Sequence, residues 1–156
     1  MKLTHTPGAP FALNGDAELL HLNIRKDGPD DERVLAVDIK LTVVVPADPL
    51  LFYFDQMLWP MFYDSAGIVR CPFIAAVDFT ASVPDAVIQF AHGEVQLFHV
   101  KLHKFKLAPL DSRRLRLTFQ ATAHPTEDEI ALLSGYVSDA VRVEIKDGSL
   151  FAGSAP

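Results

Sequence analysis

The 156-residue chain has a single cysteine, Cys71, so it cannot form an internal disulfide bond. One cysteine fits a reducing compartment, and the apolar setting before Pro72 predicts a buried structural thiol. Long uncharged hydrophobic runs are also missing. The longest apolar stretch, residues 43–63, is interrupted by Asp48, Asp55 and prolines, which makes it a poor membrane span.

The sequence likewise lacks a leader-like start and the common catalytic motifs. The first residues have no continuous apolar run of the signal-peptide kind, so we expect a cytoplasmic protein. Neither a glycine-rich phosphate loop nor a GxSxG turn occurs. His99 and His103 would lie about 13 Å apart on a strand, too far to share a metal ion. We therefore expect no metal, no cofactor and no enzyme activity.

The composition is that of an ordinary globular protein. Hydrophobic residues make up 49% and charged residues 22% of the chain, which predicts one domain over residues 1–156 with its own core. The formal net charge is −6, which argues against binding nucleic acid through overall charge. Any such binding must therefore use a local concentration of cations.

Alternating apolar and polar residues predict that much of the chain is β-strand. After an irregular lead-in at residues 1–16, Leu20, Leu22 and Ile24 alternate with polar residues. Residues 35–45 then carry an apolar side chain at every second position. The polar, acidic segment 27–33 between the two strands predicts a hairpin with an acidic tip.

An aromatic helix is predicted next. Asp48 and Pro49 favour a helix start, so we expect a helix over about residues 49–58 that ends near Pro60. Its aromatic side chains predict either a core helix or a partner-binding face. The candidate partner-binding residues are Phe52, Tyr53, Trp59 and Tyr63. Beyond them we expect a loop, a short strand around residues 74–82 and a turn at Pro84–Asp85.

A strand with a broken pattern follows a tight turn at His92–Gly93, where glycine tolerates positive φ. The apolar residues of strand 95–107 change parity midway. Before the change they are Phe98, Val100 and Leu102, and after it they are Phe105 and Leu107. A β-bulge near His103–Lys104 would return both sets to the core.

Positive charge is concentrated around this strand. Residues 98–119 hold six of the fourteen Lys and Arg residues and only one acid. The pleat of this strand and of the next, which starts at Arg114, would turn these cations outward. The face is either a phosphate-contacting patch or a solubilising surface. We expect no aromatic residue on it, and so no base stacking. The candidate nucleic-acid-binding residues are Lys101, Lys104, Lys106, Arg113, Arg114 and Arg116.

The C-terminal part predicts one helix and one strand. Thr126 and Glu129 have the spacing of a capping box, which marks a helix start. Residues 140–145 predict a last strand, and residues 148–156 a disordered tail. The whole pattern predicts an α+β fold rich in antiparallel strands, with two long hairpins, six or more strands and two helices packed on the sheet.

The region from about His92 to Ile145 contains a K-x-x-K-F strand, a turn, a strand followed by H-P, a helix and a VRVEI strand. This pattern resembles a group of small uncharacterised proteins encoded by phages and prophages, whose genes tend to lie near DNA-recombination genes. The resemblance implies a phage origin and a DNA-related or host-directed role, and it supplies no catalytic residue.

From these observations we expect a non-enzymatic phage accessory protein that binds nucleic acid or a recombination partner. The alternative is a protein–protein inhibitor or adaptor that acts on a host factor through the acidic tip or the aromatic segment. A homo-oligomer is compatible with the sequence, and no membrane partner is expected.

Overall fold

The computed structural model describes residues 2–3, 11–29, 34–47, 54, 58–70, 77–80 and 82–148. Antiparallel strands dominate these residues, which confirms the β-rich character predicted from the sequence. The strands are β1 (Lys2–Leu3), β2 (Ala12–Asp27), β3 (Val34–Pro46), β4 (Val77–Phe79), β5 (Val83–Phe90), β6 (Val95–Leu110), β7 (Arg114–Ala123) and β8 (Ala140–Asp147).

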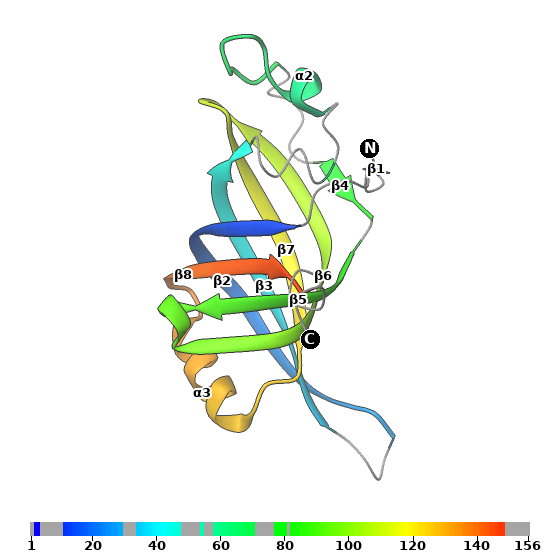
Figure 1. Ribbon diagram of the computed structural model, residues 1–156, viewed down its shortest axis with the longest axis vertical. Helices are drawn as coiled ribbons and strands as arrows, with labels where there is room; N and C mark the ends of the chain where they lie inside the picture. Colours follow the sequence, from blue (N-terminus) through cyan, green and yellow to red (C-terminus); the bar gives the residue numbers. More distant parts are fainter. Residues whose placement is uncertain are drawn as a thin grey trace, which may run out of the picture.

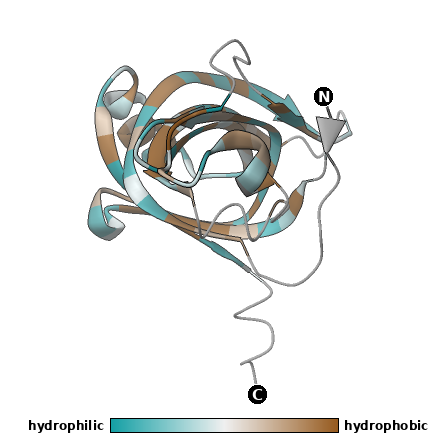
Figure 2. Cartoon of the chain, turned by 90° about the horizontal axis from the view of Figure 1, so that it is seen from above, coloured by the Kyte–Doolittle hydropathy of each residue, from teal (hydrophilic) through white to brown (hydrophobic). Residues whose placement is uncertain are grey.

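The described strands form one sheet in the order β1-β4-β6-β5-β8-β2-β3-β7. Because β6 also pairs with β7, the strands from β6 through β7 in that order close on themselves as an antiparallel barrel. Figure 2 looks down on this ring, and Figure 1 shows it from the side. Closure pairs strand edges that would otherwise be exposed.

The described helices are minor elements and do not form a layer over the sheet. They are α2 (Leu58–Phe62), the 3-10 turn η1 (Ala91–Gly93) and α3 (Glu127–Tyr136). Figure 1 places α2 and α3 toward opposite ends of the molecule. Within the described part of the chain, no helix has the length and apolar character needed to cross a membrane.

An aromatic cluster fills one part of the barrel interior. The ring of Phe105 lies 5.2 Å from that of Phe54, 5.7 Å from Phe11, 5.9 Å from Phe119 and 6.2 Å from Phe79, between ring centroids. All five side chains are almost fully buried. Edge-to-face and tilted pairs at these distances stabilise a core beyond the area that they bury. Strand β6 must therefore turn Phe105 inward.

The predicted bulge in β6 does this. The register with β7 shifts between His103 and Lys106, and Lys104 has a φ of 57°. Leu102 and Phe105 are both buried, although they lie on opposite parities. The sequence-based prediction of a bulge near His103–Lys104 is confirmed.

A second bulge in β6 was not predicted. Ala86 pairs with Val100 and Ile88 pairs with Leu97, so Phe98 and His99 together oppose one residue of β5. His99 has a φ of 54°. Leu97 is buried, whereas Phe98 is 58% exposed. The prediction that Phe98 belongs to the core is therefore wrong, because the extra residue turns it outward.

Strand β2 also departs from the prediction. It starts at Ala12, so the irregular lead-in assigned to residues 1–16 is wrong for residues 12–16, and residues 2–3 form β1. Its register with β3 shifts between Leu19 and His21, which leaves Leu20 40% exposed. The hairpin of β2 and β3 is confirmed and projects beyond the barrel (Figure 1). Tip residues 30–33 lie outside the described residues.

Further expectations had mixed outcomes. The short strand around residues 74–82 corresponds to β4, but Pro84–Asp85 lies within β5 and is not a turn. Most of the predicted helix 49–58 lies outside the described residues, and helix α2 continues past Pro60. Gly148, the first residue of the predicted tail, forms a turn, and residues 149–156 lie outside the described residues. The turn at His92–Gly93 is confirmed, with a φ of 97° at Gly93.

The capping box of α3 is confirmed. The Glu129 N–H donates to Thr126 Oγ1 at 3.2 Å, and the Thr126 N–H donates to Glu129 Oε1 at 2.9 Å. Ile130 and Leu133 follow one turn later and are buried. The cap therefore fixes the helix start that brings these two side chains into the core.

Replacing Thr126 with Ala should lower the free energy of unfolding by about 1 kcal/mol, because one helix N–H loses its acceptor. This corresponds to a melting temperature lower by about 2–4 °C for a domain of this size. Thr126→Ser keeps the acceptor oxygen and should melt close to the wild type. Thermal unfolding followed by circular dichroism at pH 7 measures both variants. An unchanged melting temperature for Thr126→Ala would contradict a stabilising cap.

Candidate nucleic-acid interface

The outward side chains of β3, β7 and β6 form one continuous surface, which we call the basic face. The register places Thr118 beside Thr42 and Lys106, and Gln120 beside Lys40 and His103. The surface is therefore continuous across three paired strands. Its cations are Lys40 of β3, Arg114 and Arg116 of β7, and Lys101, Lys104 and Lys106 of β6.

The cations of the basic face are exposed, and within the described residues none of them forms an ion pair. Two basic residues of β8, by contrast, have acidic partners. Arg142 lies 3.7 Å from Asp16, and Lys146 lies 3.1 Å from Glu144. The charge of the basic face is thus left available to an anionic partner.

A hollow of about 510 Å³ opens beside the Lys104 bulge. Strand β4 ends at Phe79 and β5 begins at Val83, and both strands pair with β6 on either side of this gap. The hollow is lined by Asp78, Phe79, Thr80, Ser82, Lys101, His103, Lys104, Phe105 and Lys106. Three lysines thus face one carboxylate, so the hollow favours an anionic ligand.

A hydrogen-bonded chain crosses the sheet from the hollow. Thr122 Oγ1 lies 3.0 Å from His103 Nε2 and donates to Asp38 Oδ1 at 2.7 Å. Because the hydroxyl proton points to Asp38, the Thr122 oxygen accepts from the Nε2–H of His103. Arg25 Nε donates to Asp38 Oδ2 at 3.0 Å. The chain holds His103 in one tautomer and occupies both oxygens of Asp38.

The surroundings shift the pKa of both titratable groups. Partial burial lowers the pKa of His103, and the charges of Lys101 and Lys104 lower it further, against the opposing effect of Asp38. Burial raises the pKa of Asp38, but the hydrogen bonds and charge of Arg25 with the bond from Thr122 outweigh it, so the net shift is downward. Asp38 is thus ionised and paired with Arg25, so it offsets little of the charge of the basic face.

Arg113 does not join the basic face, although it was a candidate. Its backbone N–H donates to the Gly67 carbonyl at 3.4 Å, and its Nη2 lies 3.5 Å from the Ser65 carbonyl oxygen. Asp111 Oδ1 accepts from the Val69 N–H at 3.0 Å. These contacts fasten the β6–β7 turn to the loop that follows α2, which gives Arg113 a structural role.

Lys40 was missed by the sequence reasoning. Its polar position on β3 was recognisable, but the pairing of β3 with β7 joins segments about eighty residues apart and has no local signal. Apart from Arg113, the candidate cations all lie on the basic face, and they are Lys101, Lys104, Lys106, Arg114 and Arg116.

Of the four candidate partner-binding aromatic side chains, the structure describes only that of Tyr63. Tyr63 is 1% exposed, and its hydroxyl donates to the Arg114 carbonyl, so this side chain belongs to the core. Phe52 and Tyr53 lie outside the described residues. Trp59 belongs to α2, but its side chain also lies outside what the structure describes. Tyr63 is therefore removed from the predicted partner-binding face, and for Phe52, Tyr53 and Trp59 that face stays a prediction.

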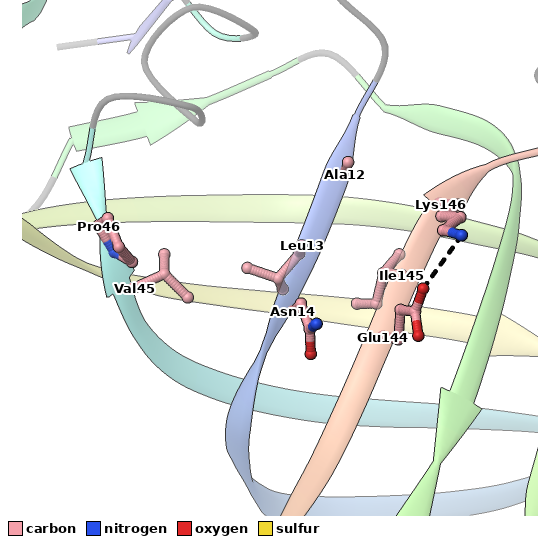
Figure 3. A pocket seen from close by; sticks show the side chains of 8 residues that line it. All are labelled: Ala12, Leu13, Asn14, Val45, Pro46, Glu144, Ile145 and Lys146. Atoms are coloured by element: carbon pink, nitrogen blue, oxygen red, sulfur yellow. Dashed lines mark ion pairs between the residues drawn. The ribbon is translucent and has the colours of Figure 1, made fainter. Parts of the chain in front are cut away.

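A second hollow, of about 340 Å³, lies where β2 and β3 separate (Figure 3). Leu13, Val45 and Ile145 line it but are themselves buried, and the ion pair of Glu144 with Lys146 lies at its side. This hollow is a gap between two strands of the barrel wall, and its lining has no excess of positive or negative charge. The lysine-lined hollow on β6 is therefore the stronger candidate site.

The titration of His103 tests this geometry. Its pKa, measured by NMR, should lie below the ordinary value of 6.5. Replacing Lys101 and Lys104 with Gln should raise it by removing two repulsive charges, whereas Lys26→Gln on the distant hairpin should leave it unchanged. Because the unfolded chain binds this proton first as the pH falls through about 6.5, stability should decrease toward lower pH. A pKa of 6.5 or above would contradict the environment described.

The functional assignment rests on the charges and the hollow of the basic face. No protein-family model matches this chain, and comparison with curated proteins and with solved structures finds no significant match. The function is therefore inferred from the chemistry of strands β3, β6 and β7.

Proposed function

We propose that the protein binds nucleic acid, without catalysis, through the basic face. The observation that carries this proposal is a set of exposed, unpaired cations on three adjacent strands of a protein with a net charge of −6. A solubilising surface needs no such segregation of sign. Lys and Arg that neutralise phosphates release counterions, which is the main source of sequence-independent affinity.

The dimensions of the basic face suit a polyanion. Allowing for one bulge, Lys101 and Lys106 are about 13 Å apart along β6 at about 3.3 Å per residue. From β3 to β6 the face spans about 10 Å, since neighbouring strands lie about 4.8 Å apart. A surface of this size contacts several phosphates, which lie about 3.4 Å apart along the axis for each strand of a duplex.

A second candidate function is a protein–protein adaptor. It is favoured by the β2–β3 hairpin, which extends beyond the barrel and leaves Ile24 48% and Val34 53% exposed. The acidic tip of this hairpin is also one of the two predicted sites of contact with a host factor, and the aromatic segment is the other. The basic face ranks first because its charges and its hollow specify the chemistry of the ligand.

The biological setting of the proposal comes from the sequence alone. The resemblance to phage-encoded proteins suggests an accessory role near DNA recombination. A phage origin would place the protein in the cytoplasm of the host cell. The proposed binding itself depends on neither point.

Charge reversal tests the proposal. The triple variant Lys104→Glu, Lys106→Glu and Arg116→Glu should bind single- and double-stranded oligonucleotides at least about tenfold more weakly, and its salt slope should fall by about one unit for each lost phosphate contact. The control variant Lys26→Glu, Arg142→Glu and Lys146→Glu has the same net charge but leaves the basic face intact. Fluorescence anisotropy between about 50 and 200 mM salt measures both variants.

The control separates local from overall charge. Equal losses in the two triple variants would show that overall charge, and not the basic face, governs binding. No binding by the wild type at the lowest salt would overturn the proposal and leave the basic face as a solubilising surface. Circular dichroism verifies that each variant is folded before its affinity is compared.

A further inference from the structure

We infer that the nucleic acid taken by the basic face is single-stranded, and that Phe98 is the platform on which one base stacks. This inference rests on the proposed function. At 58%, Phe98 has the largest exposed fraction among the large hydrophobic residues that the structure describes. Most phenylalanines of the described chain are nearly fully buried, so its position needs a physical cause.

That cause is the second bulge of β6. Phe98 and His99 share one partner position on β5, so both side chains lie on the outer side of the barrel wall. His99 has a φ of 54°, which is unusual for a residue with a side chain. Its Nδ1 lies 3.1 Å from Asp85 Oδ1. This contact directs His99 toward β5 and leaves the ring of Phe98 exposed.

The exposed ring lies in line with the lysines of the basic face. Along β6 the outward positions run from Phe98 through Lys101 to the hollow with Lys104 and Lys106. After allowing for the bulges, Phe98 lies about 7 Å from Lys101 and about 20 Å from Lys106, at about 3.3 Å per residue. One strand of nucleic acid lying along β6 would place a base on the ring and phosphates near the lysines.

This arrangement discriminates between single strands and duplexes. In a duplex the faces of the bases are stacked on one another, so a ring on a protein surface cannot reach them without unstacking. A single strand presents those faces freely, and sites that combine aromatic platforms with a cationic track bind it without sequence preference. The ring of Phe98 would therefore add affinity for single strands alone.

The hollow beside Lys104 also suits an anionic ligand. Its volume of about 510 Å³ lies within the range of small-molecule sites, roughly 300–1,000 Å³. Its lysines supply cations that suit the phosphate of one nucleotide, whereas the lining residues Phe79 and Phe105 are themselves buried. An exposed phenylalanine could instead contact a protein, but the flanking lysines favour an anionic partner.

Substitutions of Phe98 test the inference. Phe98→Ala and Phe98→Leu should each weaken binding of an oligothymidine of about 12 nucleotides by about tenfold, because the stacked base loses its platform. The salt slope should stay unchanged, since no phosphate contact is lost. Phe98→Tyr keeps the ring and should bind like the wild type. The matched control is Ile24→Ala, which removes an exposed apolar side chain from the β2–β3 hairpin, outside the basic face. None of these changes should weaken binding of a duplex of equal length.

The outcomes separate this inference from the proposed function. If Phe98→Ala affects neither nucleic acid while the wild type binds both, the basic face binds nucleic acid and the stacking role is overturned. An equal loss for single strand and duplex also overturns it. If the wild type binds neither, both proposals fall. As a second readout, Phe98→Trp should show fluorescence quenching on binding oligothymidine, beyond that of Trp59 in the wild type, and no additional quenching contradicts a stack.

Discussion

Strand β6 imposes the constraint on which the rest of the structure depends. It pairs with β5 and β4 along one edge and with β7 along the other, and the β6–β7 pairing closes the barrel. Its apolar residues do not follow one period-two pattern, so an unbroken strand would turn Leu102 or Phe105 outward. The bulge at Lys104 resolves this conflict, and the bulge at His99 lets Leu97 and Val100 both face inward. The aromatic cluster around Phe105 depends on the bulge at Lys104.

The same bulges determine the outer surface. The one at His99 exposes Phe98, and the one at Lys104 keeps Lys104 and Lys106 outward beside the hollow. Core packing and the proposed binding surface thus have one structural origin. The neighbouring carboxylate of Asp38 is paired with Arg25, so an acidic protein presents a local cationic surface.

The sequence revealed only those features that leave a local signal. The parity change between Leu102 and Phe105 exposes the Lys104 bulge, and Thr126 with Glu129 marks a helix start. The parity change between Leu97 and Val100 that marks the His99 bulge is obscured, because Phe98 alternates with Val100 and Leu102 as in a regular strand. Residues 12–16 looked irregular, yet Gly15 suits a strand position where Val43 approaches closely. The place of Lys40 depends on long-range pairing that no local pattern encodes.

The most direct test of the account is to map the bound strand on the protein by NMR. The isotope-labelled protein would be titrated with oligothymidine while its amide signals are followed. The account predicts that the largest shifts occur along β6 from Phe98 to Lys106 and on the adjoining outward positions of β7, with little change on β8. Shifts confined to the β2–β3 hairpin or to β8, or no shifts at low salt, would contradict the claim that the bulged strand is the binding surface.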